Sequence, residues 1–314
     1  MIHLTDIAEA HQRIGKYIHC TPVLTNRSIN AMAGADLFFK CENFQKAGAF
    51  KFRGACNAVF SLSGDEMSKG VCTHSSGNFA QALALAASMR SIPAYIVMPR
   101  NASPVKVAAV EGYGGIIFFC EPTLAAREET AAAVIAKTGA RFVHPYDDYK
   151  IIAGQGTAAF EAIRQTEKPD IVIAPVGGGG LLSGTAIAAK ESLPGVQVIA
   201  AEPLGANDAF RSFYSRTWTP SVKPDTIADG LLTSLGERNF PIILQYVDQI
   251  LTCTEPGITH AMKLMWERMK IVVEPSSAVP LACMLEHPSV FAGKKVHVIV
   301  SGGNVDLRAD YWGN

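Results

Sequence analysis

The sequence predicts an α/β protein built on mostly parallel sheet. Short runs rich in β-forming residues alternate with alanine-rich stretches along the chain, which is the pattern of strand and helix units. Several of these runs are apolar throughout, as expected for strands that helices cover on both faces. Glycines follow several runs directly, at the strand ends where open α/β sheets bind ligands. The chain has 314 residues, and we expect two lobes.

The predicted elements follow one another in a regular order. The strands are 37–43, 95–99, 116–119, 171–176, 196–203 and 296–303. The first 14 residues predict an amphipathic surface helix, because charged residues interrupt the apolar ones. The clearest helix is 258–270, and its apolar face at helical spacing is a core face made of Ile258, Met262, Met265 and Met269.

Composition excludes several classes of protein. Lys plus Arg and Asp plus Glu are 28 each, so no net charge recruits nucleic acid or an anionic membrane. No run approaches the roughly 20 uninterrupted apolar residues of a spanning helix, and no export signal is visible. The seven cysteines contain no CxxC pair, which disfavours a disulfide framework and a zinc site. We therefore expect a cytoplasmic protein without a membrane or nucleic-acid partner.

Lys51 is the first candidate for chemistry. It lies between Phe50 and Phe52 and is followed by Arg53. A lysine in a poorly hydrated aromatic setting beside another cation has its charged form disfavoured, so the free amine is available to form a Schiff base. The same segment also fits a surface lysine whose stem passes two core phenylalanines. On this segment alone both interpretations stay open.

The residues Ser75, Ser76, Gly77 and Asn78 end a short strand and lead into an alanine-rich helix. Backbone N–H groups at such a turn, with a helix N-terminus behind them, form a site for a carboxylate. An ordinary helix cap would also place serine or asparagine here. Three polar residues and a glycine in succession exceed what capping needs, so the segment predicts an anionic ligand.

A phosphate cradle is predicted at the four consecutive glycines that separate strand 171–176 from an apolar helix. Glycine lets the backbone approach a phosphate closely and direct its N–H groups at it, at a cost in conformational entropy. The segment lacks the lysine of a P-loop and the GxGxxG spacing of a dinucleotide site. A tight loop without a ligand is the alternative. The cradle consists of Gly177, Gly178, Gly179 and Gly180.

Two further segments carry weaker signals. The last strand ends in Ser301 and two glycines, which is a second glycine-rich strand end or a plain turn. After strand 196–203, Glu202 and Asp208 could supply oxygen ligands to a hard divalent cation. His144 and the other histidines show no paired spacing and read as structural residues.

In this order, the segments resemble the fold-type II pyridoxal-phosphate enzymes (tryptophan synthase β-like). The nearest resemblance is to the group of serine racemase, serine/threonine dehydratase and threo-3-hydroxyaspartate ammonia-lyase. It extends from about Thr5 to Leu307 and implies two open, twisted, mostly parallel sheets flanked by helices. The motifs that carry it are FFKCENFQKAGAFKFRGA, THSSGN, IAGQGT, PVGGGG, TIADG, WERMK, VEPSSA and SGGNVDL.

The resemblance also implies roles for individual residues. Lys51 would carry pyridoxal 5'-phosphate and move the Cα proton, and Ser76 would be the acid/base on the opposite face. The other cofactor contacts would come from Phe50, Asn78, Gly177, Gly178, Gly179, Gly180, Leu181 and Ser301. The substrate carboxylate would lie at Ser75, Ser76 and Gly77, and Arg127 could receive a second carboxylate or be a solvated helix residue. A divalent cation (Mg²⁺, Mn²⁺ or Ca²⁺) would be held by Glu202, Asp208 and the carbonyl of Ala206.

The expected reaction is α,β-elimination from a small β-hydroxy amino acid, 3-hydroxyaspartate, L-serine or L-threonine, to a 2-oxo acid and ammonia, with racemisation alongside. The alternative is primarily a serine racemase. A homodimer is implied, with a large cofactor domain at 1–68 and 147–314 and a small mobile domain at 69–146. A nicotinamide-dependent oxidoreductase is a rival, because Glu202 lies 22 residues after Gly180 where a ribose ligand would stand. A non-catalytic scaffold is the other rival.

Overall fold

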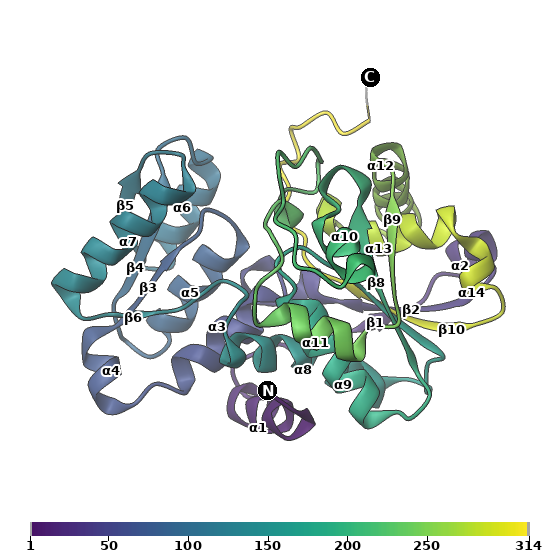
Figure 1. Ribbon diagram of the computed structural model, residues 1–314, viewed down its shortest axis with the longest axis horizontal. Helices are drawn as coiled ribbons and strands as arrows, with labels where there is room; N and C mark the ends of the chain where they lie inside the picture. Colours follow the sequence, from purple (N-terminus) through teal and green to yellow (C-terminus); the bar gives the residue numbers. More distant parts are fainter. Residues whose placement is uncertain (1, 313–314) are drawn as a thin grey trace.

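The structure is a computed structural model that describes residues 2–312, and its strands form two separate sheets. The larger sheet has the order β1-β2-β10-β7-β8-β9 and the smaller one the order β5-β4-β3-β6. All pairings are parallel except that of β1 with β2. The smaller sheet and its helices lie to one side of the larger one (Figure 1). The predicted α/β class with two mostly parallel sheets is therefore confirmed.

The larger sheet is assembled from both ends of the chain. Its strands are β1 (Val23–Leu24), β2 (Asp36–Cys41), β7 (Ile171–Pro175), β8 (Gln197–Pro203), β9 (Gln249–Cys253) and β10 (Lys295–Val300). Every residue of β7 is buried, and alternate side chains pack into two different hydrophobic clusters. This burial is why the central strands are apolar throughout, since both faces are covered by helices.

Helices cover the two faces of this sheet in distinct groups. One face packs against α2 (Arg27–Ala33), α12 (Glu255–Leu264), α13 (Pro275–Glu286) and the short α14 (Pro288–Phe291). The other face packs against helices that include α9 (Gly180–Ser192), α10 (Asp208–Ser215) and α11 (Asn239–Tyr246). Outside these lie α1 (Leu4–Ile14) and α8 (Tyr149–Gln165), which share a cluster with α9. The N-terminal helix buries one side only, as its sequence predicts.

The smaller sheet lies within residues 71–142. Its strands are β3 (Val71–His74), β4 (Ala94–Pro99), β5 (Ile116–Cys120) and β6 (Arg141–Phe142). One face packs against α5 (Asn78–Ser88), α6 (Pro104–Gly112) and α3 (Lys51–Phe60), and α7 (Leu124–Thr138) covers the other. The remaining helix is α4 (Gly64–Lys69). Since α3 belongs to the same hydrophobic cluster as β3 and α5, the core of this lobe extends beyond its sheet.

Several local predictions differ from the structure in instructive ways. The apolar run of β5 is an edge strand and leaves Ile116 and Phe119 exposed instead of buried. The predicted helix 258–270 ends as a π-helical turn at Met265–Met269, although Ile258, Met262 and Met265 are buried as expected. Within residues 2–312, no helix combines the length and apolar character that crossing a membrane requires.

Candidate active site

A cavity of about 440 Å³ lies where the carboxyl ends of β3, β7 and β10 meet. The chain enters it just after each of these strands, as expected for an open α/β sheet. Of the residues that the sequence assigns to cofactor and substrate, all line this cavity: Phe50, Lys51, Ser75, Ser76, Gly77, Asn78, Arg127, Gly177, Gly178, Gly179, Gly180, Leu181 and Ser301. The structure thus brings together segments that are up to 251 residues apart, from Phe50 to Ser301.

Lys51 is the first residue of α3 and reaches into the cavity among aromatic rings. Its Nζ donates a hydrogen bond to the carbonyl oxygen of Pro145 at 2.9 Å. The same Nζ lies 5.1 Å from the ring centroid of Phe50 and 5.8 Å from that of Phe79. Burial lowers the pKa of Lys51 from 10.5 to about 8, against an opposing effect of the Glu274 charge. A cavity lysine with this pKa supplies a free amine near neutral pH.

The expected influence of Arg53 on this lysine is wrong. The sequence suggested that poor hydration and the neighbouring cation together lower the pKa of Lys51. Burial is the cause, and Arg53 is not among the contributors. The guanidinium of Arg53 turns away from the cavity and is paired with Glu42 and Glu161. Its charge is therefore compensated locally.

The segment after β3 places its polar groups along one wall of the cavity. Asn78 begins α5, and its amide nitrogen donates to both carboxylate oxygens of Glu274 at 3.1 and 3.0 Å. Its amide oxygen accepts from Asn304 at 3.0 Å. Ser75, Ser76 and Gly77 lie in the turn before it, at the N-terminus of an 11-residue helix. Such a turn can bind a carboxylate through backbone N–H groups.

The glycine loop after β7 has no room for side chains. A Cβ on Gly178 would lie 2.3 Å from ring atoms of Tyr146, and a Cβ on Gly180 would lie 2.8 Å from the carbonyl oxygen of that tyrosine. Gly179 has a φ of 92°, in the left-handed region that favours glycine, and caps α9. The loop therefore exposes backbone to the cavity at the N-terminus of a 13-residue helix, which suits a phosphate.

Ser301 directly follows β10 and presents a neutral hydroxyl to the cavity. Its Oγ lies 2.9 Å from Oγ of Ser277, which in turn accepts from the N–H of Gly302 at 2.6 Å. Both serines are buried. A hydroxyl held in this way can exchange a hydrogen bond with a ring nitrogen without carrying charge.

Sequence reasoning missed three contributors to the cavity. Glu274 is 3% exposed, and burial is the main reason why its pKa rises to about 7. Tyr146 lies against the glycine loop, and Lys106 forms an ion pair with Asp229 at 2.8 Å between α6 and the larger lobe. Each is a single residue from a distant segment with no local pattern. The only signal was that Glu274 stands inside the motif VEPSSA.

Arg127 and two histidines lie on the side of the smaller lobe. Arg127, on α7, lines the cavity, and its buried Nε has no hydrogen-bond partner among the described residues. His74 also lines the cavity, and its ring lies edge-on to that of His144 with 6.3 Å between the centroids. Burial lowers the pKa of His144 to about 4. Nδ1 of His144 accepts from the N–H of Asp147 at 2.9 Å. A neutral, hydrogen-bonded His144 fits the structural role that its sequence suggested.

The predicted cation ligands lie apart from the cavity, at the end of β8. Glu202 is fully buried, and its carboxylate accepts from the N–H groups of Ala209 and Phe210 in the first turn of α10. Asp208 begins that helix and accepts from the N–H of Leu235 at 2.8 Å. Burial raises the pKa of Glu202 well above its usual value and that of Asp208 to about 6.

Two buried carboxyl groups with raised pKa values are chemically suited to a hard cation. The third predicted ligand is the carbonyl of Ala206, a buried residue that lies between Glu202 and Asp208 in the chain. Among residues 2–312, no cluster of three or more Asp, Glu, His or Cys side chains could hold a metal. A cation here would therefore depend on carbonyl or water oxygens. Glu202 does not line the cavity, so it cannot bind a ribose there, which removes the support for a nicotinamide cofactor.

Comparisons with known proteins agree on one family. The model of the family "Pyridoxal-phosphate dependent enzyme" matches residues 14–302. The chain is 54% identical to a serine racemase of Dictyostelium discoideum over 313 residues, which cover 98% of this chain and 96% of the relative. It is 51% identical to a beta-hydroxyaspartate dehydratase of Paracoccus denitrificans, over 98% of both chains. The crystal structure of the Dictyostelium racemase superposes with a TM-score of 0.94, at 53% identity over 98% of this chain and 99% of that one.

Proposed function

The chain belongs to the pyridoxal-phosphate-dependent enzymes, in the group of serine racemases and β-hydroxyaspartate dehydratase, and on that premise we propose that it racemises serine and also dehydrates it. The observation that carries the proposal is one cavity lined by both Lys51 and Ser76, which come from different elements. Racemisation needs a proton carrier on each face of Cα, and these two side chains supply them. The sequence favoured elimination as the main reaction, whereas relatives at 54%, 49% and 47% identity are serine racemases.

The residues of the cavity fit pyridoxal 5'-phosphate. Lys51 would hold its aldehyde carbon, the glycine loop its phosphate, Asn78 its phenolic oxygen and Ser301 its ring nitrogen. The loop fits because its glycines leave backbone exposed where a Cβ would collide with Tyr146. When bound, the cofactor withdraws electrons from Cα of the amino acid and so acidifies the hydrogen there. Ser301 supports a weak form of this effect, because a neutral hydroxyl does not hold the ring nitrogen protonated.

The side chains of this protein would perform the remaining work. Ser75, Ser76 and Gly77 bind the carboxylate of the substrate and so fix which face of Cα meets Lys51. The amine of Lys51 removes the Cα proton, and its lowered pKa keeps part of it in the basic form at neutral pH. Return of a proton from Ser76 to the opposite face inverts the centre. Loss of the β-hydroxyl before that return gives the 2-oxo acid and ammonia after hydrolysis.

A dehydratase of 3-hydroxyaspartate is the second candidate. Arg127 lines the cavity with an unpaired buried Nε, and a guanidinium binds a carboxylate in two parallel hydrogen bonds. A second carboxylate on the substrate would give the Nε of Arg127 a hydrogen-bond acceptor. The relative from Paracoccus denitrificans supports this reading by its name and its 51% identity.

Incubation with a panel of substrates separates the two candidates. The purified protein with its cofactor and Mg²⁺ is given L-serine, D-serine, L-threonine or L-threo-3-hydroxyaspartate, and 2-oxo acid and enantiomer composition are followed together. D-serine and pyruvate from L-serine would support the racemase. Oxaloacetate from hydroxyaspartate far above pyruvate from serine would support the dehydratase, and Arg127→Met should then abolish that preference. No reaction with any of the four would refute both.

We also propose a divalent cation, Mg²⁺, Mn²⁺ or Ca²⁺, at Glu202, Asp208 and the Ala206 carbonyl. Its support is the pair of buried carboxyl groups with raised pKa values. It would stabilise the turn between β8 and α10 and take no part in the chemistry. The homodimer, the cytoplasmic location and the mobility of the 69–146 domain stay predictions from the resemblance.

A further inference from the structure

Four charged side chains form a buried network behind the cavity, on the side of α3 opposite to Lys51. Arg53, Lys40 and Glu42 are fully buried, and Glu161 is 5% exposed. Lys40 and Glu42 come from β2 and the turn after it, Glu161 from α8 and Arg53 from α3. The network therefore joins the larger sheet to the helix that begins with the cofactor lysine.

Arg53 forms hydrogen-bonded ion pairs with two carboxylates, those of Glu42 and Glu161. Its Nε and one terminal nitrogen donate to the two oxygens of Glu42 at 2.6 and 2.8 Å. Its two terminal nitrogens donate to the two oxygens of Glu161 at 2.8 and 2.7 Å. Paired contacts of this kind fix both the position and the plane of a guanidinium, which a single contact does not.

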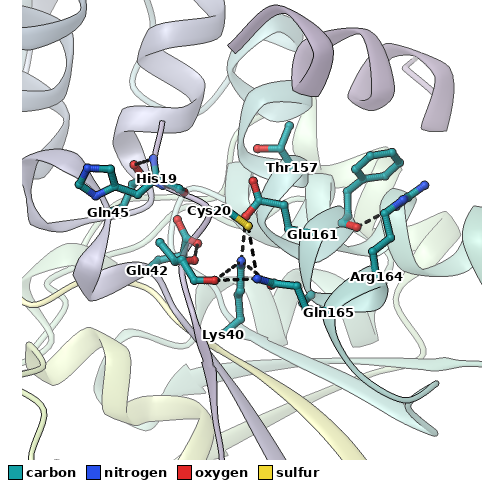
Figure 2. A network of polar contacts seen from close by, with 12 residues as sticks. His19, Cys20, Lys40, Glu42, Gln45, Thr157, Glu161, Arg164 and Gln165 are labelled. Carbon is teal, nitrogen blue, oxygen red and sulfur yellow. Dashed lines mark hydrogen bonds and ion pairs between the residues drawn. The ribbon is translucent and has the colours of Figure 1, made fainter. Parts of the chain in front are cut away.

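Lys40 completes the charge balance of the network. Its Nζ donates to Glu161, to the side-chain oxygen of Gln165 and to the carbonyl of Thr21, each at 2.8 Å; Figure 2 shows Lys40, Glu161 and Gln165 converging. Burial alone would raise the pKa of Glu161, but Arg53 and Lys40 lower it overall. Two cations face two anions, so the network is neutral and can stay buried.

The backbones of α3 and α8 touch next to this network. A Cβ on Gly154 would lie 2.6 Å from Cα of Gly54 and 2.7 Å from the carbonyl oxygen of Arg53. The N–H of Gly54 donates to the side chain of Gln155 at 3.1 Å. Close packing and the ion pairs together oppose a shift of the first turn of α3 along α8.

We propose that Arg53 is a positioning residue for Lys51, and that its two carboxylate partners fix the angle at which the lysine amine meets the cofactor. This rests on the proposed function, because it presupposes that Lys51 bonds to the aldehyde. In that step the amine nitrogen adds to the aldehyde carbon and water leaves. Arg53 lies only two residues after Lys51, so a tilt of the first turn moves the amine directly. A displacement of about 1 Å at a reacting atom can cost a factor of about 100 in rate.

Two matched double variants test the proposal. Arg53→Met with Glu42→Gln removes one cation and one anion and leaves Lys40 paired with Glu161. Lys40→Met with Glu161→Gln also removes one of each, but Arg53 keeps Glu42 and can donate to the amide oxygen at position 161. Replacing a buried pair by neutral residues of similar size often preserves stability, so both are expected to fold.

The readout compares two ligands of the full-length protein. Both ligands can use the phosphate loop, Asn78 and Ser301, but only pyridoxal 5'-phosphate can bond to Lys51, because 4'-deoxypyridoxine 5'-phosphate has no aldehyde. We expect the first double variant to bind the deoxy analogue as the unchanged protein does. Its affinity for pyridoxal 5'-phosphate and its rate of visible-band formation should fall about tenfold or more. The second double variant keeps Arg53 and its pair with Glu42 and loses only one of the two carboxylate partners, so its loss should be clearly smaller than that of the first.

Three results would overturn the proposal. They are a folded first variant with an unchanged ratio of the two affinities, equal losses in both double variants, and equal losses for both ligands. Should the first variant fail to fold, the single variant Arg53→Lys is used, because it keeps the charge but cannot form paired hydrogen bonds with two carboxylates. An unchanged ratio of the two affinities in Arg53→Lys also refutes the positioning role. If the unchanged protein gives no visible band with pyridoxal 5'-phosphate, the proposed function fails instead.

Discussion

The pH dependence of cofactor attachment follows from the surroundings of Lys51. With a pKa of about 8 in place of 10.5, about one tenth of the Lys51 amine is uncharged at pH 7, against roughly one in 3,000 for an unperturbed lysine. Burial thus raises the supply of reactive amine roughly 300-fold, which corresponds to about 3 kcal/mol. The rate of attachment to the cofactor-free protein should rise about tenfold per pH unit up to about pH 8 and then level off.

Glu274→Gln is the perturbation that tests the cause. The charge of Glu274 raises the pKa of Lys51 against the effect of burial, so its removal should move the plateau to lower pH. Growth of the visible band in a stopped-flow instrument gives the rate, and binding of 4'-deoxypyridoxine 5'-phosphate corrects for ionisation of the cofactor. Asp248→Asn, which removes an acid paired with Lys190 elsewhere on the protein, serves as control. A rate still rising tenfold per unit above pH 9, or a shift of the plateau to higher pH in the variant, would refute the reasoning.

Three further predictions concern the phosphate loop, the proposed cation and the ion pair beside the cavity. Gly178→Ala should weaken binding of pyridoxal 5'-phosphate at least tenfold in a spectroscopic titration, because the new Cβ would lie 2.3 Å from the ring of Tyr146. The control variant Gly112→Ala, which has open space around the new Cβ, should bind the cofactor as the unchanged protein does. EDTA should lower Tm by roughly 5 °C at pH 7.5, because it removes the proposed cation from the turn between β8 and α10. The free energy of unfolding of the cation-free protein should fall as pH rises from 3.8 to about 6, since folded Asp208 then holds a proton that its unfolded form has lost. Lys106→Met should raise the KM for the substrate about two- to fivefold at low salt, because it removes the ion pair between α6 and the larger lobe beside the cavity. Exchange of the charges of Lys106 and Asp229 should restore KM, and an unchanged KM in Lys106→Met would refute a role of this ion pair in substrate binding.

Many of the cavity-lining residues could be predicted because they belong to contiguous polar or glycine-rich segments at strand ends. Asn78, Gly179 and Ser301 all lie shortly after strands of parallel sheets, which bring such ends together, and the strands before Gly179 and Ser301 have distinctive apolar sequences. The resemblance to a known family supplied their roles. The strands at β1, β6 and β9 were missed because the first two have only two residues each and the third contains the polar residues Gln249 and Thr252.

Contributions that depend on packing could not be predicted from sequence. Glu274 influences Lys51 only because α13 begins beside α5 and directs a buried carboxylate at Asn78. Arg53 looked like a neighbouring charge, yet its partners lie 11 and 108 residues away in the chain. Helical spacing places Arg53 on a different side of α3 from Lys51, but which element receives it is decided by the tertiary fold. Edge strand β5 likewise has the composition of a buried strand.

Conversion of L-serine in D₂O tests the central claim most directly. The holoenzyme and its Ser76→Ala variant are incubated with L-serine, and deuterium at Cα is measured separately in L-serine and D-serine by mass spectrometry after chiral separation, together with pyruvate. We predict D-serine labelled at Cα and pyruvate from the unchanged protein, with D-serine formation lost and pyruvate retained in the variant. Unlabelled D-serine, or equal racemisation by the variant, would contradict an account in which Lys51 and Ser76 carry protons on opposite faces.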